Sequence, residues 1–255
     1  MEKRTLAKKK IYDSYVFSTK EKLMYGAAGM IFTFAIGYIF YRRIGFSVLL
    51  SFLGLYYLKM KKKQSVKKQK QELNVQFKDL LYFLSTSLSA GRSLENAFES
   101  SLESLQRLYG HEESHIVAEV MIILGRLNMG DTVEECLIDF SKRARIEDIS
   151  NFTDVLVTCK RKGGNVNEVI RNASRVIKDR IEIMQEIEIM LAGKRMEQRI
   201  LGISPVALIL LLSWLAEDFM APVFNSLLGH TVMTVALVLI ALGYLWSKKI
   251  MDISV

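Results

Sequence analysis

Two histidines stand four positions apart in the segment HEESH, residues 111–115. The spacing matches the H-E-x-x-H pattern, in which two imidazoles one helical turn apart bind zinc and the glutamate acts as general base. Against this chemistry, Glu113 places a second carboxylate beside the base, and acidic residues in a first helical turn are stabilised by the helix dipole. We therefore expect no metal and no other cofactor. The alternative is a membrane metalloprotease that uses His111, Glu112 and His115.

Other residues that could do chemistry lack the spacing that the chemistry needs. Gly163-Gly164 is not followed by the lysine and hydroxyl of a phosphate-binding loop. Cys136 and Cys159 have no metal-ligand spacing, and two cysteines at apolar helical positions indicate reduced core thiols. The sequence therefore favours a protein without a catalytic site.

One turn sequence occurs three times in the chain: GRSLENAF from Gly91, GDTVEECL from Gly130 and GGNVNEVI from Gly163. The starts of successive copies are 39 and 33 residues apart. The glycine can end a helix in the left-handed conformation, and the Ser, Thr or Asn two residues later can cap the next helix. Capping boxes are predicted at Thr132 with Glu135 and at Asn165 with Glu168. The predicted turn residues are Gly91, Ser93, Gly130, Thr132, Glu135, Gly163, Gly164, Asn165 and Glu168.

Between these turns the apolar residues recur only with the helical period, and no alternating strand pattern is present. The stripes predict six helices in an antiparallel bundle, so the fold class is all-α. The last helix has no stop signal between Val166 and Gly193 and is expected to run to about Arg199 and into a membrane span. The basic stretch Lys59–Lys70 similarly contains no Gly or Pro. Two continuous helices would therefore connect the bundle to the bilayer.

Four uncharged apolar runs predict four transmembrane helices: Leu23–Tyr41, Ile44–Leu58, Ile200–Ala216 and Thr231–Trp246. The second and fourth have about 15 residues each, which is fewer than the ~20 that cross a bilayer comfortably. No Asp, Glu, Lys, Arg or His interrupts any of the four runs. A proton-coupled transporter, which usually carries such groups at membrane depth, is therefore not indicated.

The basic residues predict the orientation. Seven Lys and Arg precede the first run and seven lie in Lys59–Lys70, whereas the loop Glu217–His230 has none. By the positive-inside rule both termini and the bundle face the cytosol, and only Arg42 and Arg43 break the rule. The net charge of +8 is thus explained by contact with anionic membrane lipid, and nucleic acid is not expected as a partner. The expected location is the cytoplasmic (inner) membrane.

The predicted organisation is a sequence of six segments. Residues 1–22 form a basic cytosolic N-terminus, 23–58 a transmembrane hairpin, 59–72 a basic stalk, 73–199 a cytosolic helical bundle, 200–246 a second transmembrane hairpin, and 247–255 a cytosolic C-terminus.

The parts of the chain follow one another in a fixed order: two spans, a basic stalk, LLYFLSTSLSAGRSLENAF, MGDTVEECL, KGGNVNEVI, a long helix and ISPVALILLL. In this order the chain resembles the type II secretion system F family (GspF/PilC-like). Pro205 in the third span also fits. A single F domain between two pairs of spans is most similar to the TadB and TadC platform proteins of tight-adherence (Flp) pili. GspF and PilC carry two such domains.

The resemblance implies a non-enzymatic platform protein of a type IV-like pilus or type II secretion machine. It implies coupling of a cytosolic hexameric secretion ATPase to pilin extraction and assembly, together with a second platform subunit or self-oligomer. A membrane signalling or scaffold protein is a further alternative. If the bundle meets the motor at its turns, the expected contact residues are Arg92, Glu95, Asp131, Glu134 and Lys162.

Overall fold

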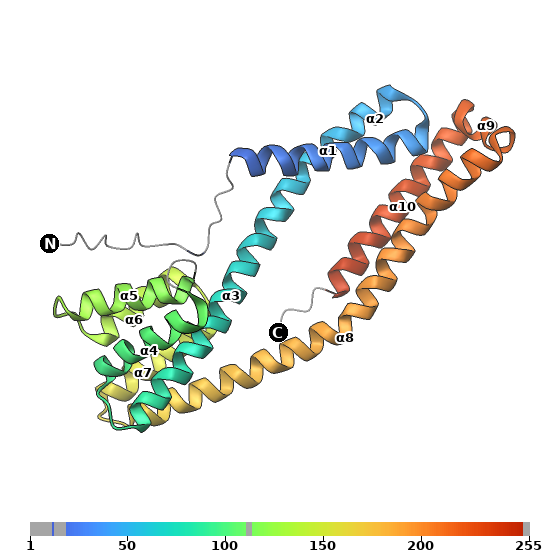
Figure 1. The fold of residues 1–255 in the computed structure, drawn as a ribbon. Coiled ribbons are helices and arrows are strands. Elements are labelled where there is room, and N and C mark those ends of the chain that lie inside the picture. The colour runs from blue at the N-terminus through green and yellow to red at the C-terminus, as the bar shows by residue number, and fades with distance from the viewer. Residues whose placement is uncertain (1–11, 13–18, 111–113, 252–255) are drawn as a thin grey trace. The chain divides into compact units, whose positions relative to one another are not determined.

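The computed structural model describes residues 12, 19–110 and 114–251, and all regular elements in these ranges are helical. Figure 1 shows their order. The elements are α1 (Thr19–Tyr41), α2 (Ile44–Ser51), the 3-10 helix η1 (Phe52–Leu55), α3 (Tyr56–Ser89), α4 (Leu94–Tyr109), α5 (His115–Leu127), α6 (Val133–Ala144), α7 (Glu147–Arg161), α8 (Val166–Leu215), α9 (Glu217–Asn225) and α10 (Leu227–Met251). The all-α class is as predicted.

The chain divides into two compact units. We call Lys63–Ile183, together with the N-terminal residues that include Tyr12, the helical unit. Phe17–Lys62 and Met184–Val255 form the membrane unit. The continuous helices α3 and α8 each contribute to both units.

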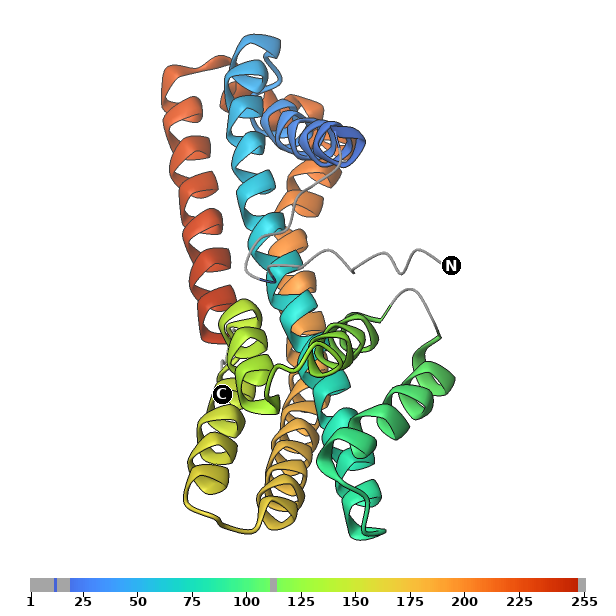
Figure 2. The same ribbon diagram turned by 90° about the vertical axis from the view of Figure 1, so that its left-hand side faces the viewer.

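The helical unit is organised around one apolar core. In Figures 1 and 2, α4 to α7 gather around the later part of α3 and the early part of α8. Its buried side chains follow the predicted helical stripes and include Phe77, Leu81, Phe98, Leu105, Ile116, Val120, Leu137, Phe140, Phe152, Leu156 and Ile170. Within it the rings of Phe140 and Phe152 contact Phe77, with centroids 6.1 and 5.5 Å from the Phe77 centroid. The antiparallel six-helix geometry remains a prediction.

Three apolar positions of α7 and α8 do not belong to this core: Val155, Val176 and Cys159, of which the last is half-buried although it was expected as a core thiol. Val155 and Val176 are 54% and 63% exposed. Both lie beside buried positions, so the apolar stripe of the sequence is wider than the face that α7 and α8 bury.

In the described part of the membrane unit, three helices are long and apolar enough to cross a bilayer: α1 over Leu23–Tyr41, α8 and α10 over Leu227–Ser247. The fourth predicted span is corrected, because its helix begins at Leu227 rather than Thr231 and its apolar stretch has 21 residues. The predicted loop Glu217–His230 contains α9. The second predicted span, Ile44–Leu58, is not one helix but α2, η1 and the start of α3. The count of four spans is therefore not confirmed.

Small residues line the contact between α1 and the segment that returns from it. The Thr33 hydroxyl donates to the carbonyls of Gly29 at 2.9 Å and Ser51 at 3.4 Å, and Ser51 Oγ donates to the Met30 carbonyl at 3.3 Å. Ser47 is fully buried. A Cβ on Gly37 would lie 2.9 Å from the Ser47 Cα. We call this contact the small-residue seam, an arrangement typical of helices that pack in membranes.

Arg42 joins three elements at the turn that follows α1. Its φ of 49° places it in the left-handed region. Its guanidinium donates to the Ser213 carbonyl in the last turn of α8 at 3.4 Å and lies 5.7 Å from the centroid of the Phe224 ring in α9. A cation at a helix C-terminus is favourable because the last carbonyls have no partners within the helix. This contact gives a structural reason for an arginine where the positive-inside rule expects none.

The long helix α8 passes through Pro205 without ending. Proline has no N–H for the carbonyl four residues earlier, which here is that of Leu201. The neighbouring Ser204 hydroxyl donates to this carbonyl at 3.1 Å. The polar group that the proline leaves unpaired is thus satisfied locally, as an apolar environment requires.

The seam makes a testable prediction. A methyl group on Gly54 would lie 2.6 Å from the carbonyl carbon and oxygen of Gly29. We expect Gly54→Ala to lower the free energy of unfolding by about 1–3 kcal/mol, the usual cost of overpacking, seen as a lower melting temperature in detergent. Gly45→Ala is the matched control, because a Cβ there meets nothing within 4 Å. Equal melting temperatures for the two variants would contradict the seam.

Candidate functional site

The three repeated glycine turns have the same backbone geometry. Gly91, Gly130 and Gly163 have φ of 81°, 95° and 67°. In each turn the glycine amide donates to the carbonyl three residues earlier, and the next amide donates to the carbonyl five residues earlier, which is the Schellman motif. The pairs are Gly91 to Leu88 and Arg92 to Ser87, Gly130 to Leu127 and Asp131 to Arg126, and Gly163 to Lys160 and Gly164 to Cys159, all within 2.9–3.3 Å.

A side-chain cap starts the helix after each turn. Ser93 accepts from the Asn96 amide and Asn165 from the Glu168 amide, both at 3.3 Å. Thr132 accepts from the Glu135 amide at 3.3 Å, and the Glu135 carboxylate accepts from the Thr132 amide at 3.1 Å. In the three turns, all of which the structure describes, both hydrogen bonds of a capping box are present at Thr132. At Asn165 only one bond of the predicted box is present, from the Glu168 amide to the Asn165 side chain.

Gly164 lies in close contact with the preceding helix. A Cβ at this position would lie 2.7 Å from the Cys159 sulfur. Gly163 therefore supplies the positive φ, and Gly164 supplies the space that the preceding helix fills.

The five predicted contact residues differ in their surroundings. Arg92 and Glu95 are exposed at the start of α4, and Arg92 donates to Ser100 Oγ. Lys162 is exposed at the C-cap of α7. Asp131 and Glu134 are half-buried and paired within the unit. The five residues thus differ in whether the helical unit already provides a partner of opposite charge.

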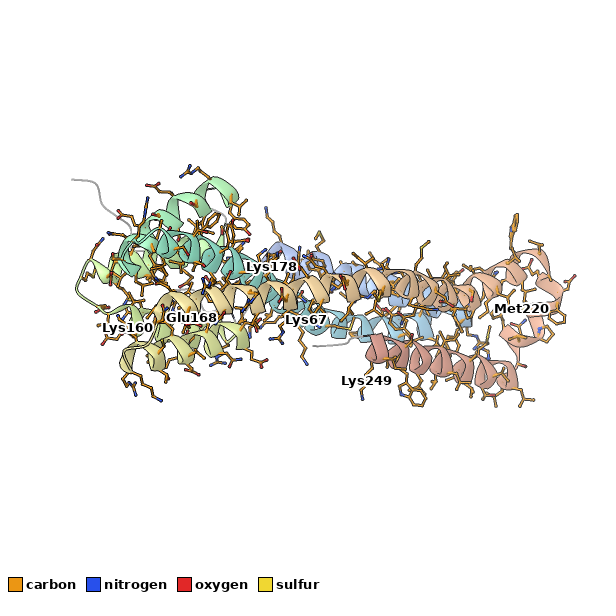
Figure 3. The ribbon with its side chains drawn as sticks, turned by 90° about the horizontal axis from the view of Figure 1, so that it is seen from below. Lys67, Lys160, Glu168, Lys178, Met220 and Lys249 are labelled. Carbon is orange, nitrogen blue, oxygen red and sulfur yellow. The ribbon has the colours of Figure 1, made fainter. Side chains whose placement is uncertain are left out.

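Glu134 connects two of the turns. Its carboxylate accepts from Lys160 Nζ at 2.8 Å, which joins the first turn of α6 to the last turn of α7. Figure 3 labels Lys160 and Glu168 on either side of the α7–α8 turn. Burial raises the pKa of Glu134, but the hydrogen bond and charge of Lys160 outweigh this, so that the pKa lies below its ordinary value.

Asp131 is the outermost member of a series of ion pairs that we call the ion-pair chain. Its carboxylate accepts from Arg126 Nε at 2.6 Å. Arg126 Nη1 lies 3.6 Å from Asp139 Oδ2, and the same oxygen accepts from Arg143 Nε at 3.0 Å. Arg143 then donates both terminal nitrogens to the Glu119 carboxylate at 2.6 Å each.

The inner end of the ion-pair chain is buried. Glu119 and Tyr12 are each 1% exposed, and the Tyr12 hydroxyl donates to Glu119 Oε1 at 2.9 Å. The Tyr12 amide donates to the Arg143 carbonyl at 3.3 Å. Burial and then the Glu119 charge raise the pKa of the Tyr12 hydroxyl far above its ordinary value, so the phenol stays protonated and serves as a donor. The N-terminal segment is thus bound to α5 and α6 by its one described residue.

Asp148 joins the two long helices within the helical unit. Its carboxylate accepts from Asn74 Nδ2 of α3 at 2.7 Å and pairs with Arg180 Nη1 of α8. Asp148 lies in the first turn of α7, where the helix dipole favours an anion. A single side chain therefore holds α3, α7 and α8 together.

The alternative zinc site at His111, Glu112 and His115 is not tested by the structure. His111, Glu112 and Glu113 lie outside the described residues. His115 is the first residue of α5, and its ring meets the Tyr12 ring edge-on with centroids 5.5 Å apart. In the ranges that the structure describes, no group of three or more His, Cys, Asp or Glu could hold a metal.

Sequence reasoning missed four residues of this arrangement: Tyr12, Glu119, Arg143 and Asp148. Glu119 offered a signal, because it is a single charge within the otherwise apolar stretch IVAEVMIIL. A lone carboxylate at such a position needs a buried cation. Nothing local distinguishes Tyr12 from Tyr15, the other tyrosine of the basic N-terminus.

Comparison with known proteins gave one family match. The family described as type II secretion system (T2SS), protein F, matches residues 80–213, which is more than half of the chain. No curated protein and no solved structure matched. The matched range begins within α3 and ends within α8. It includes the three glycine turns and the ion-pair chain from Asp131 to Glu119, but not Tyr12.

The buried end of the ion-pair chain makes a prediction about stability. Arg143→Met leaves the Glu119 carboxylate buried without its cation, and we expect a loss of roughly 3–5 kcal/mol in the free energy of unfolding. Tyr12→Phe removes one hydrogen bond to a paired carboxylate, and we expect a loss of about 1.5–3 kcal/mol. Chemical denaturation of the full chain in detergent measures both.

The control is the double variant Glu119→Leu/Arg143→Met, which removes both charges. It should be more stable than Arg143→Met alone, because no ion remains buried unpaired. A double variant that is less stable than Arg143→Met would show that the pair itself, and not the unpaired carboxylate, determines the loss.

Proposed function

Because the chain belongs to the type II secretion system protein F family, we propose that it couples a cytosolic secretion ATPase to the extraction and assembly of pilin. Members of this family are platform proteins of secretion or pilus machinery in the inner membrane and are generally non-enzymatic. The observation that carries the proposal is the 50-residue helix α8, which leads from the core of the helical unit through an apolar stretch suited to a membrane.

We propose a path with four crossings of the membrane. Tyr12 is buried in the helical unit, so residue 12 and Lys63 lie on the same side of the bilayer. If α1 crosses, another segment before Lys63 must cross back. The apolar segment Ile44–Leu58 can do so, because α2, η1 and α3 follow one another without a loop and the small-residue seam holds α2 and η1 against α1.

The short length of this return segment is compatible with crossing. As a helix, 15 residues span about 22 Å, and flanking lysines can extend their ammonium groups to the headgroups. At the end of the hairpin that is opposite to the Arg42 turn, the Lys61 ammonium lies 5.8 Å from the centroid of the Tyr25 ring. Tyrosine and lysine together are typical of a membrane interface.

The proposed orientation places the helical unit and both termini in the cytosol. The supporting observation is the excess of basic residues before α1 and in Lys59–Lys70. The apolar side chains that α8 and α10 leave exposed, such as Trp214 and Trp246, would then face lipid, pilin or a second platform subunit.

We further propose that this platform is of the TadB or TadC type that serves tight-adherence pili. The support is the single matched stretch of F-family sequence, with apolar helices before and after it. The partner would be either a second platform protein or another copy of this chain.

The exposed charges at the turns are the proposed contacts with the motor. Arg92, Glu95 and Lys162 are exposed, and among the described residues none of them forms an ion pair that would compete with a partner. Asp131 and Glu134 already have cations in the unit, so a partner must share or displace Arg126 and Lys160.

Charge reversal tests the motor contact. We expect Glu95→Lys combined with Lys162→Glu to reduce co-purification of the cytosolic ATPase with the tagged full chain about tenfold or more, because like charges across an interface cost several kcal/mol. The matched control is Lys194→Glu combined with Glu197→Lys, which exchanges two exposed charges of α8 in the membrane unit and also leaves the net charge unchanged. Undiminished co-purification of the double variant would exclude these contacts, and no co-purification with the wild type would exclude motor coupling.

A kink in α8 tests rigid transmission. Met184 lies inside α8, and Met184→Pro removes a backbone donor and bends the helix. We expect pilus assembly to be lost while the ATPase still co-purifies, whereas Met184→Ala supports assembly. Assembly that persists in the proline variant would contradict transmission through a stiff α8.

A further inference from the structure

The outward side of α4 and of the turn before it carries charges at regular intervals. Three carboxylates, four residues apart, stand between two arginines: Arg92, Glu95, Glu99, Glu103 and Arg107. Side chains at these intervals lie on one side of a helix. All five residues are exposed. We call this surface the acidic face; it is negative in the middle and positive at both ends.

The carboxylates of the acidic face are not balanced within the chain. Like charges four residues apart destabilise an isolated helix. Glu103 lies 3.7 Å from Arg107 Nη2, but the two side chains are 70% and 77% exposed, so the pair contributes little. Glu95 and Glu99 form no ion pair with any residue that the structure describes. A cation from outside would therefore relieve the repulsion along this face.

Part of the acidic face is hollowed. Arg92 extends along the helix and donates to Ser100 Oγ, and an open groove of about 400 Å³ lies beside it. The groove is lined by Arg92, Asn96, Glu99, Ser100 and Glu103. These side chains are all polar and two of them are carboxylates. The groove therefore suits a guanidinium or an ammonium group and not an apolar side chain.

The first part of α8 carries the opposite pattern. Two arginines, four residues apart, stand between two carboxylates: Glu168, Arg171, Arg175 and Asp179. All four residues are exposed, and we call this surface the basic face. Arg175 Nη2 donates to Asn172 Oδ1 at 2.9 Å. Neither arginine forms an ion pair with a residue in the described ranges.

The two faces match in the order of their charges. The acidic face is positive, negative and positive along its length, and the basic face is negative, positive and negative. Because each order reads the same from either end, the match holds for parallel and for antiparallel helices. Arg171 and Arg175 are about 6 Å apart along their helix, and so are Glu99 and Glu103. Two pairs of arginine and carboxylate can therefore form together.

The two faces do not meet within one chain. Both belong to the helical unit, in which α4 packs against α5, α5 against α6 and α6 against α7. The helices α4 and α7 are thus the two ends of this series. Figure 2 shows α4 on one side of α3, and α7 with the start of α8 on the other side. Each face is consequently available to another molecule.

We propose that the acidic face of one copy of this chain binds the basic face of a second copy, with Glu99 and Glu103 opposite Arg171 and Arg175. This choice of partner rests on the proposed function, which leaves open whether the platform contains a second protein or another copy. Because the contact joins two different surfaces, each bound copy leaves one face of each kind for a further copy. The contact therefore builds a ring or an open row of copies.

Sedimentation equilibrium of the purified full chain in detergent micelles tests the contact. Two variants each reverse one face: Glu99→Lys with Glu103→Lys, and Arg171→Glu with Arg175→Glu. We expect each variant to weaken self-association about tenfold or more, because like charges then face each other. The first variant raises the net positive charge of the chain and the second lowers it. A loss in both is therefore not an effect of net charge.

Two combinations restore the match and separate the contact from a defect in folding. The variant with all four reversals has a basic row on α4 and an acidic row on α8, and we expect it to self-associate as the wild type does. An equimolar mixture of the two reversed variants should also associate, because each offers the face that the other lacks. Differently tagged copies in this mixture should then co-purify.

The matched control exchanges an exposed pair of α3 in the same helical unit, Lys68→Glu with Glu72→Lys. It should leave self-association unchanged. Arg92 and Glu95, which are also proposed contacts with the motor, stay unchanged in every variant, so that self-association and motor binding are measured separately.

Three results would overturn the proposal. A wild-type chain that stays monomeric has no such contact. Reversed variants that associate as the wild type does place the interface elsewhere. If the reversed variants are monomeric and neither their mixture nor the fourfold variant associates, the two faces do not bind each other. Absence of ATPase co-purification from a wild-type chain that self-associates contradicts the proposed function and leaves this contact standing.

Discussion

A carboxylate that enters an apolar core has to be accompanied by its counter-ion, and Glu119 imposes this constraint on the whole helical unit. The bidentate pair with Arg143 fixes how α5 and α6 lie against each other, because two parallel hydrogen bonds of 2.6 Å tolerate little displacement. The same carboxylate accepts a hydrogen bond from Tyr12 and so holds this residue against α5 and α6. The proposed path through the bilayer, with a return crossing after α1, depends on this one buried contact.

The turns show which features of the fold can be predicted from sequence. A glycine with positive φ and a Ser, Thr or Asn cap act within a few residues, so their chemistry is visible in the sequence. The same holds for the helical stripes that supply Phe77, Phe98 and Phe140 to the core. The width of a stripe is less predictable, because neighbouring helices decide how much of it they cover. Val155 and Val176 are exposed for this reason.

The membrane segments show where prediction from sequence ends. Composition locates apolar runs, and it placed the first span at the residues that the structure gives, Leu23–Tyr41. It does not reveal that the run after Arg43 is divided by a 3-10 turn at the point where Gly54 meets Gly29. The ion-pair chain is also invisible locally, since Tyr12 and Glu119 are 107 residues apart. Asp148 likewise joins helices that are distant in sequence, and no residue spacing in the sequence predicts its contacts with Asn74 and Arg180.

The separation between Tyr12 and Glu119 also sets an order of events during synthesis. The hairpin of α1 and α2 brings together residues such as Thr33 and Ser51, only 18 positions apart, and can form soon after it leaves the ribosome. The site for Tyr12 is complete only when Arg143 has been made. Tyr12 is therefore made long before its partners, and it is packed only after the hairpin of α1 and α2 has had time to form.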